Sequence, residues 1–199
     1  MNRRGRTDPG PRPTSPTILA ISGSLRRASI NSAVLRAAAL ASAGDGIRVE
    51  VADFVRHLPP FDPDLETQPP AAAVRFRSAC DEAAAVLLAV PEYTFGIPGS
   101  FKNALDWAVG SGSLHCKPVT ALKVSPPGRG DHARETLDLA LRAHGAEVAH
   151  RSVPISHRDF DSGGEIADPR ILAELRSVVV ELGTRAGVQY PVRDLNACP

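Results

Sequence analysis

A chain of 199 residues has the size of one domain, since domains usually hold about 100–200 residues. Lys and Arg number 23 and Asp and Glu 22, which gives a formal net charge of +1, and aromatic residues make up only 5%. Proteins that bind DNA or anionic membranes usually carry a clustered basic surplus, and base-stacking modules are rich in aromatic residues. We therefore expect no nucleic acid and no membrane among the partners.

The two ends of the chain differ from its middle. Residues 1–16 contain four Arg and four Pro and no large apolar residue after Met1, which is typical of a disordered tail. They lack the apolar run of a secretory signal, and no later stretch is long and apolar enough to span a membrane. We predict a basic Pro-rich tail over 1–16, one domain over 17–190 and a C-terminal tail over 191–199.

The chain contains three cysteines, Cys80, Cys116 and Cys198. They form no CxxC pair, and their odd number argues against a disulfide framework. A reducing compartment is the simplest interpretation, so we expect a cytoplasmic protein. Cys80 lies in a helical pattern and is expected to be packed.

Apolar runs and helical repeats alternate along the chain. We expect strands at 17–21, 47–52, 84–90, 118–124 and 147–153, and helices at 30–43, 71–82, 99–110, 131–144 and 168–186. The continuous run AAVLLAV at 84–90 is typical of a parallel strand buried on both faces, and five prolines between 59 and 70 predict a loop. Asp131 is the expected N-cap of the fourth helix. The alternation predicts an α/β domain with a parallel sheet and right-handed crossovers.

The loop after the first strand has the composition of an anion site. Ligands of parallel sheets bind beyond the carboxyl ends of the strands, and residues 22–31 read SGSLRRASIN. Short polar side chains and two arginines precede a helix start whose free N–H groups attract an anion. The alternative is a capped helix start, with Ser29 as N-cap and a solvated turn before it. Neither a P-loop nor a GxGxxG pattern is present.

The loop after the third strand reads PEYTFGIPGSFKNALDW over 91–107. Its glycines and prolines favour a rigid backbone that a ligand can approach closely, and Tyr93 and Phe95 can border a flat ring. The alternative for these two aromatic residues is hydrophobic capping of the sheet edge. For Trp107 we favour helix packing or a subunit contact over a ligand contact.

Together, GSLRRASIN and PEYTFGIPGSFKNALDW resemble the two signature segments of the NADPH-dependent FMN reductase family, a flavodoxin-like group that includes quinone, azo-dye and chromate reductases. SPPGRGDHARETLDLALRAHGA at 125–146 is similar to the family's next loop and helix, so the resemblance covers most of 17–153. It implies a flavodoxin-like three-layer sandwich whose five-stranded parallel sheet has the order 2-1-3-4-5. It also implies FMN as cofactor, NADPH or NADH as hydride donor, and a homodimer or homotetramer.

The resemblance also assigns a cofactor site. Its members are Ser24, Leu25, Arg26, Ser29, Ile30, Asn31, Pro91, Glu92, Tyr93, Thr94, Phe95, Gly96 and Ser125. The first six would hold the FMN phosphate, the next six would wrap the edge of the isoalloxazine ring, and the last would flank the ring. The family usually has Asn at the position of Thr94, often Ser at that of Gly96, and a third loop richer in glycine than SPPGRG.

The chemistry that the resemblance implies belongs to the cofactor. Hydride would pass from NAD(P)H through FMN to a quinone, azo, chromate or free flavin acceptor. Backbone N–H groups of residues 93–96 would stabilise the charge that develops on the ring. We predict no catalytic side chain and no metal site. An FMN-binding electron carrier and a non-enzymatic flavin or redox sensor are the alternatives, and a hydrolase is disfavoured because no GxSxG motif occurs.

Overall fold

The computed structural model describes residues 16–125 and 130–187. The predicted C-terminal tail lies outside this part, as do the predicted N-terminal tail except Pro16 and most of the SPPGRG loop. The strands are β1 (Thr17–Ser22), β2 (Arg48–Ala52), β3 (Ala85–Ala89), β4 (Pro118–Lys123) and β5 (Glu147–Ser152). The α-helices are α1 (Ile30–Ala41), α2 (Ala71–Glu82), α3 (Gly99–Val109), α4 (Asp131–Ala143) and α5 (Pro169–Gly187).

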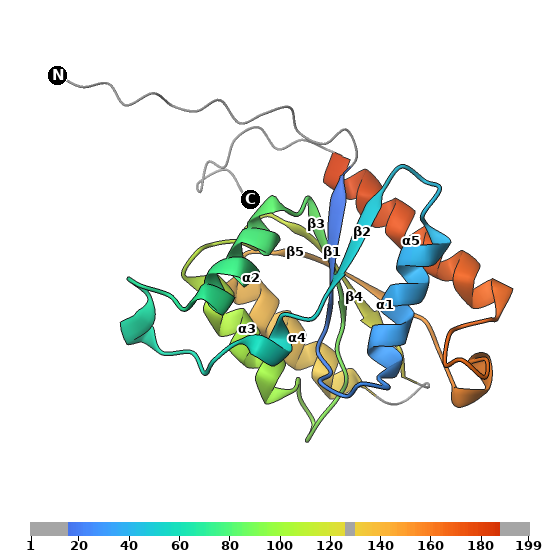
Figure 1. Cartoon of the computed structure of the whole chain (residues 1–199), viewed down its shortest axis with the longest axis horizontal. Coiled ribbons are helices and arrows are strands. Elements are labelled where there is room, and N and C mark those ends of the chain that lie inside the picture. The colour runs from blue at the N-terminus through green and yellow to red at the C-terminus, as the bar shows by residue number, and fades with distance from the viewer. Residues whose placement is uncertain (1–15, 126–129, 188–199) are drawn as a thin grey trace.

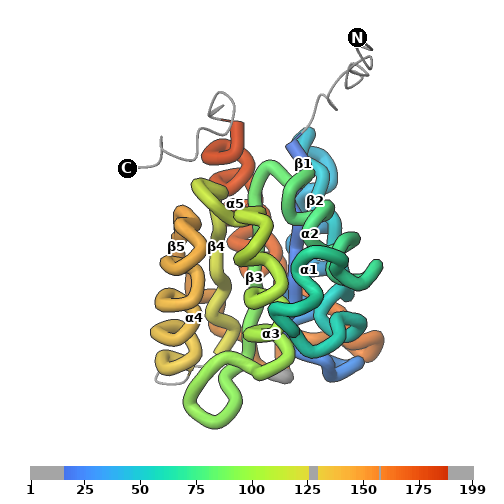
Figure 2. Tube along the Cα trace, turned by 90° about the vertical axis from the view of Figure 1, so that its left-hand side faces the viewer, coloured from blue at the N-terminus to red at the C-terminus, as the bar shows by residue number. Residues whose placement is uncertain are grey.

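The strands form one parallel sheet in the order β2-β1-β3-β4-β5, as predicted. β1 lies between β2 and β3, so that Leu19 is paired with Glu50 on one side and with Val86 on the other. The chain turns outward to β2 after β1 and then crosses over to β3. A reversal of this kind opens a crevice between the loops that follow the two strands. Figure 2 shows the loops after β1 and β3 at the same end of the molecule.

Two helical layers cover the sheet, with α1 and α5 on one face and α2, α3 and α4 on the other (Figure 1). The core between the sheet and helices α1 and α5 contains Ile18 and Leu87 from the sheet. The core on the other face contains Leu19 and Val86. β3 is buried along its whole length, which is why its sequence is a continuous apolar run. None of the helices in the described residues has the length and apolarity needed to cross a bilayer.

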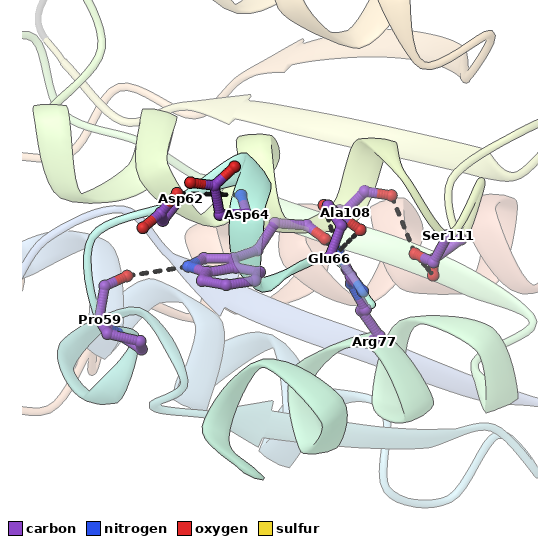
Figure 3. A network of polar contacts seen from close by, with 9 residues as sticks. Pro59, Asp62, Asp64, Glu66, Arg77, Ala108 and Ser111 are labelled. Atoms are coloured by element: carbon purple, nitrogen blue, oxygen red, sulfur yellow. Dashed lines mark hydrogen bonds and ion pairs between the residues drawn. The ribbon is translucent and has the colours of Figure 1, made fainter. Parts of the chain in front are cut away.

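Residues 53–70, here called the β2–α2 strap, pack against α3 through Trp107. The indole Nε1 donates a 2.8 Å hydrogen bond to the Pro59 carbonyl, and the ring meets Phe61 edge-on. Arg77 of α2 donates to the Trp107 carbonyl at 2.6 Å and pairs with Glu66 of the strap at 2.8 Å (Figure 3). Trp107 is fully buried. Its role is therefore packing, as predicted, and not ligand contact.

Two local predictions are wrong. The N-cap of α4 is Gly130, whose φ of 83° suits glycine, and Asp131 is the first helical residue, where it pairs with Lys123. The expectation of no disulfide fails at Cys116, which is disulfide-bonded. An odd count requires one unpaired thiol and does not forbid a pair. Cys80 is a free and buried thiol, as expected.

Candidate functional site

Serine side chains hold the loop between β1 and α1. The Ser22 hydroxyl accepts hydrogen bonds from the Ser24 amide at 3.2 Å and from the Ser32 hydroxyl at 3.0 Å. The Ser24 hydroxyl accepts from the Arg26 amide at 3.3 Å. Each bond joins residues of the loop to one another or to the start of α1. The path of the loop is therefore set by its own sequence.

Gly23 brings this loop against the end of β3. Its amide donates to the Ala89 carbonyl at 2.9 Å, which continues the ladder between β1 and β3 beyond the strand. A Cβ at position 23 would lie 2.9 Å from Cγ1 of Val90. The close approach of the two backbones therefore requires glycine at this position.

The start of α1 has the properties of an anion site. Its N-cap, Ser29, makes no side-chain capping bond, and the first N–H groups of a helix have no partner within it. Asn31 is 8% exposed, and its Oδ1 has no hydrogen-bond partner in the described residues. The side chains of Arg26 and Arg27 are exposed beside it. An uncapped helix start with a buried, unsatisfied polar side chain fits a phosphate group.

A strained turn follows β3. Tyr93 and Gly96 exchange backbone hydrogen bonds of 2.9 and 3.1 Å. Between them, Thr94 and Phe95 have φ of 52° and 57°, as in a type I′ turn. Residues with a Cβ rarely adopt this conformation, and Asn, the residue expected here from the resemblance, tolerates it better than Thr.

The aromatic residues of this turn face solvent. Phe95 is 74% exposed and Tyr93 51% exposed. Hydrophobic capping of the sheet edge would have buried them, so that alternative is wrong. The exposed ring faces are free to border a flat ligand.

A cavity of about 790 Å³ lies beside the two loops at the carboxyl end of the sheet. Small-molecule sites usually have volumes of about 300–1,000 Å³, so the cavity can hold a mononucleotide with a three-ring base. The predicted residues that line it are Ile30, Asn31, Pro91, Glu92, Phe95 and Ser125. The predicted residues that do not line it are Ser24, Leu25, Arg26, Ser29, Tyr93, Thr94 and Gly96. Each of the two loops therefore contributes some of its predicted site residues to the same cavity.

Sequence reasoning missed the far side of this cavity. His132 of α4, His150 of β5, and Ile155 and Ser156 also line it. Ile155 and Ser156 come directly after β5, so the rule that ligands bind at the carboxyl ends of strands, applied to the fifth strand, could have found them. No local pattern marks His150, whose Nε2 lies 2.6 Å from the carboxylate of Asp138.

An ion pair marks the α4 side of the cavity. Lys123, the last residue of β4, lies 2.5 Å from the Asp131 carboxylate. This hydrogen bond lowers the pKa of Asp131 below its ordinary value, so the carboxylate stays ionised at neutral pH. Two charged residues of opposite sign therefore belong to the lining of the cavity.

Comparison with known proteins agrees with this geometry. A sequence profile described as NADPH-dependent FMN reductase matches residues 16–160. The NADPH:quinone oxidoreductase of Arabidopsis thaliana is 41% identical over 176 residues, which cover 83% of this chain and 89% of the relative. The NAD(P)H-dependent FMN reductase of Pseudomonas aeruginosa is 33% identical over 77% of this chain and 85% of the relative. The structure of FerB, an NAD(P)H:acceptor oxidoreductase from Paracoccus denitrificans, superposes with a TM-score of 0.72 at 25% identity, over 86% of this chain and 97% of that one.

The matched residues contain all five strands and both loops that border the cavity. The uncapped start of α1 fits the phosphate of FMN, and the cavity fits its ring. The protein is an oxidoreductase with FMN as cofactor and NAD(P)H as hydride donor. By the extent of the profile match and by its relatives, the chain belongs to the NADPH-dependent FMN reductase family.

Proposed function

We propose that this protein reduces quinones with NAD(P)H, with FMN held between the start of α1 and the turn after β3. The observation that carries the proposal is the cavity lined by both segments. A quinone is a flat ring, and Phe95 beside the cavity is 74% exposed. Relatives from rice, Arabidopsis and potato carry the name NAD(P)H:quinone oxidoreductase or its NADPH form, which supports the same acceptor class.

The α1 side of the site would hold the phosphate. We propose that Ser24, Ser29 and Asn31 bind it with the helix amides, because these side chains are buried at an uncapped helix start. Leu25 and Ile30 would contribute backbone N–H groups. The exposed guanidinium of Arg26 would supply the opposing charge.

The β3 side would hold the ring. FMN supplies the hydride-transfer chemistry when bound. The amides of Tyr93 and Gly96 already donate within the turn, so we narrow the proposed oxyanion-type donors to the amides of Thr94 and Phe95. The reciprocal bonds of Tyr93 and Gly96 hold the turn that carries these two amides, as such donors require. Pro91, Glu92 and Ser125 line the cavity from its neighbouring loops.

The assembly is proposed from the family resemblance as a homodimer or homotetramer. Light scattering after size-exclusion chromatography measures it directly, and a monomer mass would contradict it. Cytoplasmic location stays a prediction.

The function is tested on the purified full-length protein. We expect micromolar FMN to lose fluorescence on titration, and the loaded protein to oxidise NADPH with 1,4-benzoquinone without any partner protein. Failure of FMN to change its fluorescence or absorbance would overturn the assignment. FMN binding without NADPH oxidation would instead support an electron carrier or a sensor.

The phosphate site is tested with Arg26→Ala. Loss of one charge-assisted contact weakens FMN binding by roughly tenfold or more. Arg48→Ala is the matched control, because Arg48 is an exposed arginine of the edge strand β2, 71% exposed in its side chain. Equal FMN affinity of the two variants would remove Arg26 from the site.

A further inference from the structure

The helix α4 obtains its N-terminal cap from a distant loop. Its own N-cap is Gly130, which has no side chain to accept a hydrogen bond. The Ala133 amide in the first turn instead donates to Oε2 of Glu92 at 3.0 Å, across 41 positions of sequence. Such amides have no partner inside the helix, and a carboxylate there also meets the positive end of the helix dipole. Glu92 therefore does for α4 what a local N-cap side chain does for other helices.

The turn directly after Glu92 packs against the same end of α4. The Phe95 ring meets the imidazole of His132 edge-on, with centroids 5.1 Å apart and planes at 87°. A Cβ at Gly96 would lie 3.8 Å from the Thr136 side chain, which places the backbone of Gly96 next to the second turn of α4. The loop therefore contacts the first turn of α4 through both Glu92 and Phe95, and Gly96 lies beside the second turn.

These contacts bear on a turn that is strained. Thr94 and Phe95 both have positive φ, and neither is glycine. A residue with a Cβ is strained in this conformation and keeps it only where the surroundings hold it. The reciprocal bonds of Tyr93 and Gly96 close the turn but do not fix its direction relative to the sheet. A contact with α4 can fix that direction.

We propose that Glu92 is a positioning residue, whose carboxylate caps α4 and thereby holds the 93–96 turn in the orientation that receives the flavin ring. This inference rests on the proposed function, because it assumes that the ring lies against the turn. It gives Glu92 a role different from that of a direct ligand. Its Oε2 is engaged with Ala133, and the phosphate-bearing cofactor is itself anionic, so a direct carboxylate contact is electrostatically unfavourable.

Three variants separate the possible roles of Glu92. Glu92→Ala removes the acceptor, whereas Glu92→Gln keeps an acceptor oxygen of the same reach and removes the charge. The matched control is Glu135→Gln, because Glu135 lies in the same region of α4, with a side chain 67% exposed, and its carboxylate faces His132 at 3.8 Å. The control therefore changes the charge near the helix start without removing a helix cap.

The first measurement uses the apo-protein. Hydrogen exchange followed by NMR reports on the Ala133 amide, and we expect its protection to fall by about tenfold in Glu92→Ala and to be largely kept in Glu92→Gln. Unchanged protection in Glu92→Ala would overturn the cap. This arm needs no flavin, so it stands even if the proposed function fails.

The second measurement is the dissociation constant of FMN, from quenching of its fluorescence. We expect about tenfold weaker binding in Glu92→Ala, affinity within about threefold of wild type in Glu92→Gln, and no change in Glu135→Gln. Wild-type affinity in Glu92→Ala with an unprotected Ala133 amide would overturn the positioning role. Equal losses of FMN affinity in Glu92→Ala and Glu92→Gln, with the Ala133 amide still protected in Glu92→Gln, would show that the helix cap does not set the affinity, which also overturns the positioning role. Should Glu92→Ala fail to fold, Glu92→Asp shortens the side chain by one methylene group and gives the same comparison with Glu92→Gln.

Discussion

The guanidinium of Arg56 donates a 2.6 Å hydrogen bond to the backbone carbonyl of Leu25, 31 residues earlier in the chain. Its Nε also donates to Asp53 at 2.9 Å, so two hydrogen bonds orient the guanidinium. Leu25 lies in the loop that is proposed to bind phosphate, and Arg56 lies in the β2–α2 strap. The strap, which is anchored on Trp107, therefore reaches the loop directly.

Replacement of Arg56 is expected to weaken the phosphate site without unfolding the protein. Arg56→Ala removes a bond to the loop backbone, and since the side chain is 37% exposed we place the loss of FMN affinity at the low end for charged hydrogen bonds, about tenfold. FMN fluorescence titration measures it, with Arg48→Ala as the exposed control. An Arg56→Ala protein with wild-type affinity would show that the loop holds its shape unaided.

A methyl group at position 23 is expected to separate the two loops. In Gly23→Ala, the new Cβ would lie 2.9 Å from Val90 Cγ1 and 3.3 Å from Val90 Cα, so the loop must shift. Overpacking of this kind costs about 1–3 kcal/mol in unfolding free energy. We also expect a lower FMN affinity, because the displaced loop is the one that is proposed to bind the phosphate. Gly44→Ala is the matched control, because nothing lies within 4 Å of its added Cβ. Urea unfolding and FMN titration measure the stability and the FMN affinity of both variants. Equal values for Gly23→Ala and Gly44→Ala would contradict the prediction.

Arg77, which anchors the strap to α2 and α3, is expected to contribute more to the free energy of unfolding than to FMN affinity. Arg77 is 12% exposed in its side chain and contacts Glu66, the Trp107 carbonyl and the face of the Trp107 ring. Arg77→Met keeps the apolar stem and removes these bonds, at a cost of about 2 kcal/mol in unfolding free energy, since Glu66 is partly solvated. Arg75→Met, at an exposed position of the same helix, serves as the control. A difference below about 0.5 kcal/mol between the two variants in urea unfolding would contradict the anchor.

The fold was readable from the sequence because its signals are local. The apolar run at 84–90 reports on burial, because β3 lies in the middle of the sheet and is buried along its whole length. The loop that is proposed to bind phosphate has the same local character, because Ser22 and Ser24 hold it through bonds within the loop and to the start of α1. Contacts that join distant segments leave no such pattern. The bond between Glu92 and Ala133 exists only because the loop after β3 ends beside α4.

The missed N-cap of α4 illustrates the same limit. Asp131 is a good capping residue by type, and its chain position fits. In the structure, the Asp131 carboxylate pairs with Lys123 of β4, and the N-cap position lies one residue earlier, at Gly130. The positive φ of Thr94 and Phe95 was equally hidden, because neither residue type favours it and only the surroundings impose it.

Stability at high pH is expected to depend on Cys80. Burial raises the pKa of this thiol from 9.0 to about 12, with the nearby charge of Lys117 acting weakly in the other direction. Below about pH 8 the thiol is neutral in both the folded and the unfolded chain, so its contribution is complete. Above about pH 9 only the unfolded chain ionises, and the folded state loses about 1.4 kcal/mol per pH unit until the folded pKa is reached.

Cys80→Ala isolates this effect, because other groups titrate alike in both proteins. The cavity left by the substitution adds a constant offset in favour of the wild type. We expect the difference in unfolding free energy, wild type minus variant, to be constant up to about pH 8 and to fall by about 1 kcal/mol or more between pH 9 and pH 10.5. Urea unfolding without added reductant measures it, so that no reducing agent opens the disulfide of Cys116. Parallel stability profiles of the two proteins up to pH 10.5 would mean that the thiol ionises as readily in the folded chain as in the unfolded one, and that its burial carries no electrostatic penalty.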